Sequence, residues 1–175
     1  EVLYAAGSGF FAIDVSDPRR PRLVGQYLQN GLGERMALVH PYAYVLFGDE
    51  GLCVFDVSDP SDIAFLGSLE VSEFGILRSI AAADGFVYLG AYDDIAIVDA
   101  TDPAHPVLTG TFPTHIPEDM MARDGLLFIV DHQNGLSIAD LADPGTPVRI
   151  GKVGTYSAKA VDVEENLVVI ADLNA

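Results

Sequence analysis

Two short segments rich in oxygen ligands come closest to a chemical motif in this sequence: Asp-His-Gln-Asn-Gly at 131–135 and Gly-Asp-Glu-Gly at 48–51. Carboxylate and amide oxygens bind Ca²⁺, but an EF-hand loop needs several spaced acids and a distal bidentate Glu, which neither segment supplies. We therefore expect no cofactor, and calcium bound at these segments is the alternative.

The nitrogen and sulfur side chains form no catalytic or metal-binding motif. The four histidines, His40, His105, His115 and His132, are scattered and lack the spacing of zinc ligands. No nucleophile motif or phosphate-binding glycine loop is present. The single cysteine, Cys53, lies inside an apolar run and is predicted to be a buried, unreactive thiol. We predict no catalytic residue and no metal ligand.

The composition excludes two classes of partner. Twenty-six acidic residues against nine basic ones give a formal charge of -17, which argues against nucleic acid and against an anionic membrane surface. The charge is typical of a highly soluble protein, and a surface that binds cations or a basic partner is the alternative. The apolar residues come in short runs, none near the roughly 18 residues of a membrane span.

A repeat sets the elements that must position any functional residue. The motif Asp-x-x-Asp-Pro, followed by a Gly eleven residues after the first Asp, occurs four times at intervals of 42, 43 and 41 residues. Its members are Asp14, Asp17, Pro18 and Gly25; Asp56, Asp59, Pro60 and Gly67; Asp99, Asp102, Pro103 and Gly110; and Asp140, Asp143, Pro144 and Gly151. Self-similarity at this period indicates a repeat architecture.

Each repeat is predicted to hold four short strands. In the second repeat these are 35–39, 42–47, 52–57 and 64–69, and the Asp-Gly pairs at 84–85 and 124–125 predict type I′ hairpins, with Glu165-Asn166 in the same place in the last repeat. The third strands are apolar on both faces, as expected of sheets stacked against one another. We predict an all-β β-propeller segment with blades at about 1–33, 34–76, 77–117, 118–157 and a further one begun at 158–175. An antiparallel β-solenoid is the alternative.

The repeated residues have a mechanical explanation. Each Asp can accept a hydrogen bond from the backbone just ahead of it, and Pro presets φ for the turn that follows. The Gly lies inside the fourth strand, which predicts a β-bulge or a close backbone approach. For this reason we expect Gly110→Val to damage folding more than Ser68→Val.

The segment Ile13 to Gly25 resembles the LVIVD-repeat β-propellers, and Ala96-Ile97-Val98-Asp99 is close to the tetrapeptide that names this family. The resemblance covers essentially the whole chain. It implies a propeller, usually part of a larger secreted or surface-anchored prokaryotic protein, and it carries no defined activity.

Counting strands gives one further expectation. Residues 1–8 and 167–175 both read as second strands, so a blade is left incomplete. We expect a piece excised from a larger propeller, or a chain that pairs with further blades of the same protein or with another copy. A four-bladed monomer with a spare strand is the alternative.

The predicted ligand-binding site lies at the channel mouth, where fourth strands connect to first strands at about 28–34, 70–78, 113–118 and 154–159. These loops vary while the rest repeats, and variable loops on a rigid scaffold often carry function. The candidate residues are Arg35, Arg78, Glu118, Asp119 and Lys159, with Phe74, His115 and Tyr156 nearby. A solvated funnel of ion pairs without a ligand is the alternative interpretation of their mixed charge. We expect a non-catalytic binding scaffold for an unknown protein or small molecule, extracellular or at the cell surface. A hydrolase or oxidoreductase domain with a metal held by acids at this mouth is the alternative.

Overall fold

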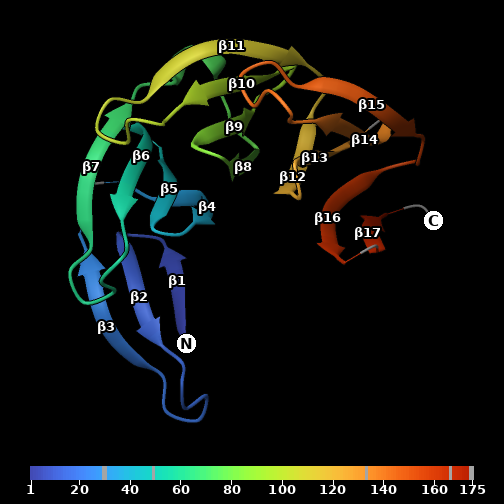
Figure 1. The fold of residues 1–175 in the computed structure, drawn as a ribbon. Coiled ribbons are helices and arrows are strands. Elements are labelled where there is room, and N and C mark those ends of the chain that lie inside the picture. Colours follow the sequence, from blue (N-terminus) through green and yellow to red (C-terminus); the bar gives the residue numbers. More distant parts are fainter. Residues whose placement is uncertain (29–30, 49, 133, 166, 174–175) are drawn as a thin grey trace. The chain divides into compact units, whose positions relative to one another are not determined.

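The computed structural model describes residues 1–28, 31–48, 50–132, 134–165 and 167–173, and strands dominate these residues (Figure 1). The strands are β1 (Val2–Ala6), β2 (Phe10–Asp14), β3 (Arg22–Tyr27), β4 (Gly33–Val39), β5 (Tyr42–Phe47), β6 (Gly51–Asp56), β7 (Ala64–Leu69), β8 (Ser79–Ala83), β9 (Phe86–Gly90), β10 (Asp94–Asp99), β11 (Val107–Pro113), β12 (Pro117–Arg123), β13 (Leu126–Asp131), β14 (Gly135–Asp140), β15 (Val148–Val153), β16 (Ala158–Glu164) and β17 (Leu167–Asp172). One short 3₁₀ helix, η1, spans Ser72–Phe74.

The strands form antiparallel meanders that match the predicted blades of a propeller-like repeat. The sheets run β1-β2-β3, β4-β5-β6-β7, β8-β9-β10-β11, β12-β13-β14-β15 and β16-β17. Two compact units contain them: residues 1–71 with 103–105, and residues 72–102 with 106–175. Within the described residues, no helix is long and apolar enough to cross a membrane.

The tight turns between first and second strands adopt the predicted conformation. Asp84 and Gly85 have φ values of 50° and 80°, and Asp124 and Gly125 have 52° and 73°. A type I′ turn requires positive φ at both central residues, so the Asp-Gly prediction is confirmed. Of the corresponding pair Glu165-Asn166, Asn166 lies outside the described residues.

The repeated Asp residues cap the loops that follow the third strands. The Oδ1 atoms of Asp56 and Asp99 accept hydrogen bonds from the backbone N–H two residues ahead, at 2.8 and 2.9 Å, and Asp14 and Asp140 do the same. Hydrogen bonds from the Ser58 hydroxyl and amide hold the pKa of Asp56 below its usual value. The predicted capping role of these carboxylates is confirmed.

The repeated glycines mark β-bulges in all four complete repeats. The register between third and fourth strands shifts next to Gly25, Gly67, Gly110 and Gly151, where one extra residue enters the fourth strand. The predicted bulge is therefore confirmed. The close backbone approach holds only in part, because a Cβ on Gly67 would lie 3.0 Å from the Pro103 oxygen, whereas a Cβ on Gly110 would meet no atom within 4 Å. The expectation that Gly110 lacks room for a Cβ is wrong.

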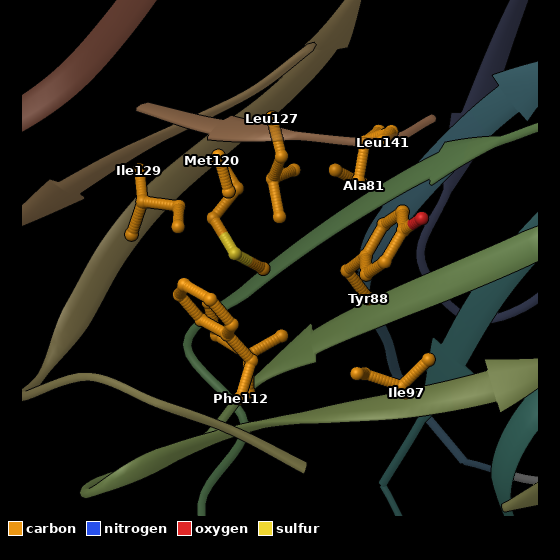
Figure 2. Packing of buried hydrophobic residues seen from close by; sticks show 10 residues of the cluster. Ala81, Tyr88, Ile97, Phe112, Met120, Leu127, Ile129 and Leu141 are labelled. Carbon is orange, nitrogen blue, oxygen red and sulfur yellow. The ribbon is translucent and has the colours of Figure 1, made fainter. Parts of the chain in front are cut away.

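Apolar layers hold neighbouring sheets together within each unit. In the second unit, one layer between the β8–β11 and β12–β15 sheets contains Ala81, Tyr88, Ile95, Ile97, Phe112, Met120, Leu127, Ile129, Ala139 and Leu141. Figure 2 shows the Met120 side chain pointing toward the Phe112 ring. In the first unit, Phe10, Phe47 and Phe55 are buried, and Cys53 is buried beside them as predicted.

Candidate functional site

The predicted site residues of the second unit come from one end of its sheets. Ser79 pairs with Gly90, Pro117 with Asp131 and Ala158 with Asp172, so the loops before each first strand lie beside the loops that follow each second strand. The first strands β8, β12 and β16 are neighbours in this unit. We call this side, formed by residues 72–78, 91–93, 114–118, 132 and 154–159, the loop end.

An ion-pair cluster lies at the loop end, centred on Glu118. The Lys159 Nζ atom lies 2.6 Å from Glu118 Oε1, and Arg78 Nη1 lies 3.7 Å from Oε2. His132 Nδ1 lies 3.6 Å from Oε1, and it is 3.4 Å from the hydroxyl of Ser157. The structure thus brings together three predicted residues, Arg78, Glu118 and Lys159, and adds His132. We call these four residues the Glu118 cluster.

Asp119 is adjacent in sequence but serves the backbone. Its Oδ2 atom accepts a hydrogen bond from the Val161 N–H at 3.0 Å, and its Oδ1 atom accepts one from the Met120 N–H at 3.0 Å. Oδ2 therefore joins β12 to β16, while Oδ1 bonds the next residue of β12, so this carboxylate has a positioning role rather than an open ligand site.

The remaining predicted residues do not join this cluster. Arg35 belongs to β4 in the first unit, where its guanidinium donates to the Glu34 carbonyl at 3.4 Å. Phe74 is half-buried in η1, and Tyr156 is 83% exposed on its loop. His115 lies with Asp93, at 3.5 Å from its carboxylate, and its ring packs edge-on against Tyr92.

A polar groove of about 220 Å³ opens between the outer parts of the β8–β11 and β12–β15 sheets. His115 lies on its wall, and Asp131 and Asn134 come from the segment considered for calcium, but the sequence analysis did not single out Ser137, Arg149 and Lys152, which also line it. Comparing the same repeat position across the four repeats would have found them, because Arg149 and Lys152 replace Leu108 and Thr111 of the preceding repeat. We call this feature the Arg149 groove.

Glu118 lies beside basic side chains, and Asp119 and Asp131 accept hydrogen bonds from backbone amides. In the part of the chain that the structure describes, no group of three or more His, Cys, Asp and Glu residues is arranged to hold a metal ion. Of the two segments considered for calcium, Asp49 and Gln133 lie outside the described residues. The Asp131 carboxylate accepts hydrogen bonds from the His115 N–H at 3.0 Å and from the Asn134 side chain at 2.9 Å, so it stabilises two loops.

Comparison with known proteins identifies the repeat and the fold. The sequence model of the LVIVD repeat matches residues 3–29, 31–71, 75–114 and 118–155. A search of curated proteins finds no match. Among solved structures, the computationally designed Ika8 protein is similar with a TM-score of 0.70 at 15% identity, over 98% of this chain and 52% of that one.

Two further structures have the same fold at equally low identity. A chain of the Nidogen/Laminin complex matches with a TM-score of 0.66 at 15% identity, over 98% of this chain and 67% of that one. Sqt1 of Saccharomyces cerevisiae matches with a TM-score of 0.70 at 12% identity, over 98% of this chain and 52% of that one. The chain thus spans about half the length of Ika8 and of Sqt1.

Proposed function

The chain belongs to the LVIVD repeat family, and from this premise we propose that it is a non-catalytic binding scaffold that contacts a protein partner through the loop end of its second unit. A repeat fold of this kind is a rigid support, and fold alone assigns no activity. The proposal therefore depends on what the loop end presents to solvent.

Three large side chains exposed at the loop end carry the proposal. Ile76 is 77% exposed, Tyr92 is 55% exposed and Tyr156 is 83% exposed, and each lies on a different loop. Tyrosine is enriched among the residues that dominate binding energy at protein interfaces, because its ring buries a large area while its hydroxyl can form a hydrogen bond. Covering exposed apolar groups of this size with a partner makes the free energy of binding more favourable.

The charges at the loop end fit the polar rim of such an interface. In the Glu118 cluster, the carboxylate of Glu118 already lies between the cations of Lys159 and Arg78. A metal-dependent hydrolase or oxidoreductase would need acids free to bind an ion, whereas ion-paired side chains at an interface rim contribute to specificity and association rate. This supports a scaffold over the enzyme alternative.

Photo-crosslinking tests the proposed surface. We would introduce p-benzoylphenylalanine at Tyr156 or Tyr92, with Val148 as the matched control, because Val148 is 62% exposed but begins β15 at the opposite end of its sheet. Crosslinking in cells or culture fluid of the source organism should give the same product at Tyr156 and Tyr92, identified by mass spectrometry, and none at Val148. Equal products at all three positions would contradict the proposal.

The identified partner, once purified, provides the quantitative test. We expect Tyr156→Ala to weaken its binding by about thirtyfold, the effect of a hot spot worth about 2 kcal/mol. Val148→Ala should leave the affinity within about twofold of wild type. Calorimetric titration measures both variants, and an unchanged affinity for Tyr156→Ala would exclude this surface.

We further propose a secreted or cell-surface location, as the family resemblance implies. The high negative charge supports this by favouring solubility of an isolated repeat domain. Fractionation of the source organism followed by immunodetection tests the location. Recovery of the protein in the cytoplasmic fraction alone would contradict it.

A further LVIVD blade is proposed as a second kind of partner, supplied by the same protein or by another copy. Val169 in β17 is 53% exposed, whereas Phe128, the third residue of the equivalent strand β13, is 6% exposed and packs against β16. A covering blade would bury Val169 in the same way. Light scattering tests the second source: self-association abolished by Val169→Asp supports another copy, and a monomer at all concentrations contradicts it.

A further inference from the structure

The Arg149 groove occupies a place that is filled by aromatic rings in the first unit. There, Tyr27 at the end of β3 packs against Phe55 and Phe65 of the next sheet, with ring centroids 5.1 and 6.0 Å apart. Phe55 and Phe65 face each other across β6 and β7. Side chains of this size leave little room between the two sheets.

The equivalent positions in the second unit carry smaller or charged residues. Ala139 and Arg149 are the cross-strand pair that corresponds to Phe55 and Phe65, and the pair Ser137 and Lys152 follows it. The β-bulge between them places Arg149 and Lys152, three residues apart, on the same face of β15. Loss of two rings therefore opens the groove, and the two cations and the hydroxyl of Ser137 line it together with the carboxylate of Asp131.

Neutral groups hold both cations in place. The Arg149 guanidinium donates to the Pro113 carbonyl at 2.6 Å and lies 4.9 Å from the centre of the Phe112 ring. Lys152 Nζ donates to the amide oxygen of Asn134 at 3.0 Å. Among the described residues, neither Arg149 nor Lys152 forms an ion pair, although the chain carries a formal charge of -17.

Ser137 gives a second indication of a ligand. Its side chain is a buried hydroxyl in a strand position filled by Cys53 and Ala96 in the two preceding repeats, and the residue is 4% exposed. Its side chain lines the groove, so its hydroxyl can donate a hydrogen bond to a group bound there.

We propose that the Arg149 groove binds a carboxylate group between Arg149, Lys152 and Ser137. Guanidinium and ammonium groups bind carboxylate oxygens through charge-assisted hydrogen bonds, and the hydroxyl of Ser137 donates to the same group. The volume suits a small organic acid or one acidic side chain rather than a large cofactor. Asp131 does not fill this place, because its oxygens accept hydrogen bonds from the loops at His115 and Asn134.

The inference goes beyond the proposed protein-binding surface, because it assigns a ligand chemistry to different residues. Repulsion from the negatively charged chain disfavours unspecific uptake of anions. Specific binding of an acid must therefore depend on the side chains that line the groove. Removing the charge of Arg149 or of Lys152 tests this directly.

Titration with defined acids tests the proposal. Succinate is the small-acid probe, a peptide of six glutamates is the protein-like probe, and the neutral diamide of succinate and inorganic phosphate are the controls. Binding is measured by calorimetry and by NMR shifts of the groove amides on the wild type and on Lys152→Gln, Arg149→Gln and Ser137→Ala. Arg19→Gln is the matched control, because it removes the same charge from an exposed turn in the first unit.

We expect at least one acidic probe to bind in the groove, and Lys152→Gln or Arg149→Gln to weaken it about tenfold or more. Ser137→Ala, which preserves both charges, should weaken it about threefold to tenfold, and Arg19→Gln should have no effect. Binding of succinate identifies a free acid as the ligand type, and binding of the peptide alone identifies an acidic side chain of a partner. Failure of both probes, equal binding of the diamide or of phosphate, or an equal loss in Arg19→Gln overturns the proposal.

Discussion

Replacing the repeated glycine in two equivalent strands should have opposite effects on stability. Gly67 and Gly110 occupy the same position next to a β-bulge in β7 and β11. A Cβ on Gly67 would lie 2.7 Å from the carbonyl carbon of Ala104 and closer still to its oxygen, whereas a Cβ on Gly110 would meet no atom within 4 Å. Neither glycine has a positive φ, so only the space around the new methyl group differs.

The magnitude follows from these contacts. The atoms that a Cβ on Gly67 would strike belong to the backbone of the Asp-Pro loop, so the loop must move by roughly 1 Å, and overpacking of this kind costs about 1–3 kcal/mol. Replacing glycine by alanine also reduces the entropy of the unfolded chain, which stabilises by about 0.4–1 kcal/mol. We therefore expect Gly67→Ala to be destabilised by about 1–2 kcal/mol and Gly110→Ala to be stabilised by about 0.5 kcal/mol.

Urea unfolding at constant pH measures both effects as shifts of the midpoint at an unchanged slope. The two other repeats supply the matched controls. Gly25→Ala should resemble Gly67→Ala, because its Cβ would strike the Pro60 carbonyl, and Gly151→Ala should resemble Gly110→Ala, because its nearest neighbour is 3.9 Å away. Equal midpoints for the Gly67 and Gly110 variants would refute the assignment of this glycine to contact between sheets.

Three further perturbations test the packing and the capping. Tyr88→Phe should cost about 1 kcal/mol in a urea titration, because the hydroxyl of Tyr88 donates to the Pro144 carbonyl at 2.9 Å. The buried thiol of Cys53 should react with a thiol reagent only when the protein unfolds, and rapid labelling of the native state would contradict this. Hydrogen bonds from Ser58 lower the pKa of Asp56 in the folded state. The ionised carboxylate therefore stabilises the folded protein at any pH above the pKa of Asp56 in the unfolded chain, which is about 3.9. This stabilisation is lost as the pH falls through the lowered pKa of the folded state. Asp56→Asn should therefore lower the urea midpoint at pH 7, with a difference from wild type that shrinks as the pH falls below about 3.9.

The local features of the fold could be predicted because each depends on a few adjacent residues. Asp84-Gly85 determines its own turn type, since both residues must adopt positive φ. Asp56 caps its loop through a bond to Ser58, two residues ahead. These local motifs recur at a nearly constant interval, and this recurrence predicts a repeated four-stranded sheet. The prediction needs no knowledge of the contacts between neighbouring sheets.

The role of the repeated glycine could not be predicted in full, because it depends on a loop from the next repeat. The bulge is local to the strand and was predicted, but contact depends on the loop opposite, which comes close at Gly67 and stays away at Gly110. The candidate site shows the same division. Glu118 and Lys159 were both expected at the loop end, while the pairing of Glu118 with His132 required the distance between two loops.

Divergence between repeats therefore points to function more directly than the shared motif does. The capping Asp residues and the bulge recur because every sheet needs them, so their presence says nothing of a ligand. Side chains that face the next sheet form neither a cap nor a bulge, and their role is to fill the space between the sheets. Phe55 and Phe65 do so in the first unit. Ala139 and Arg149 occupy the equivalent positions in the second unit. The apolar packing between sheets is reduced there, and the charge of Arg149 lines the groove. A scaffold can lose this packing in one place because the shared capping and core layers still hold the sheets, and this makes the Arg149 groove the best place to look for a ligand.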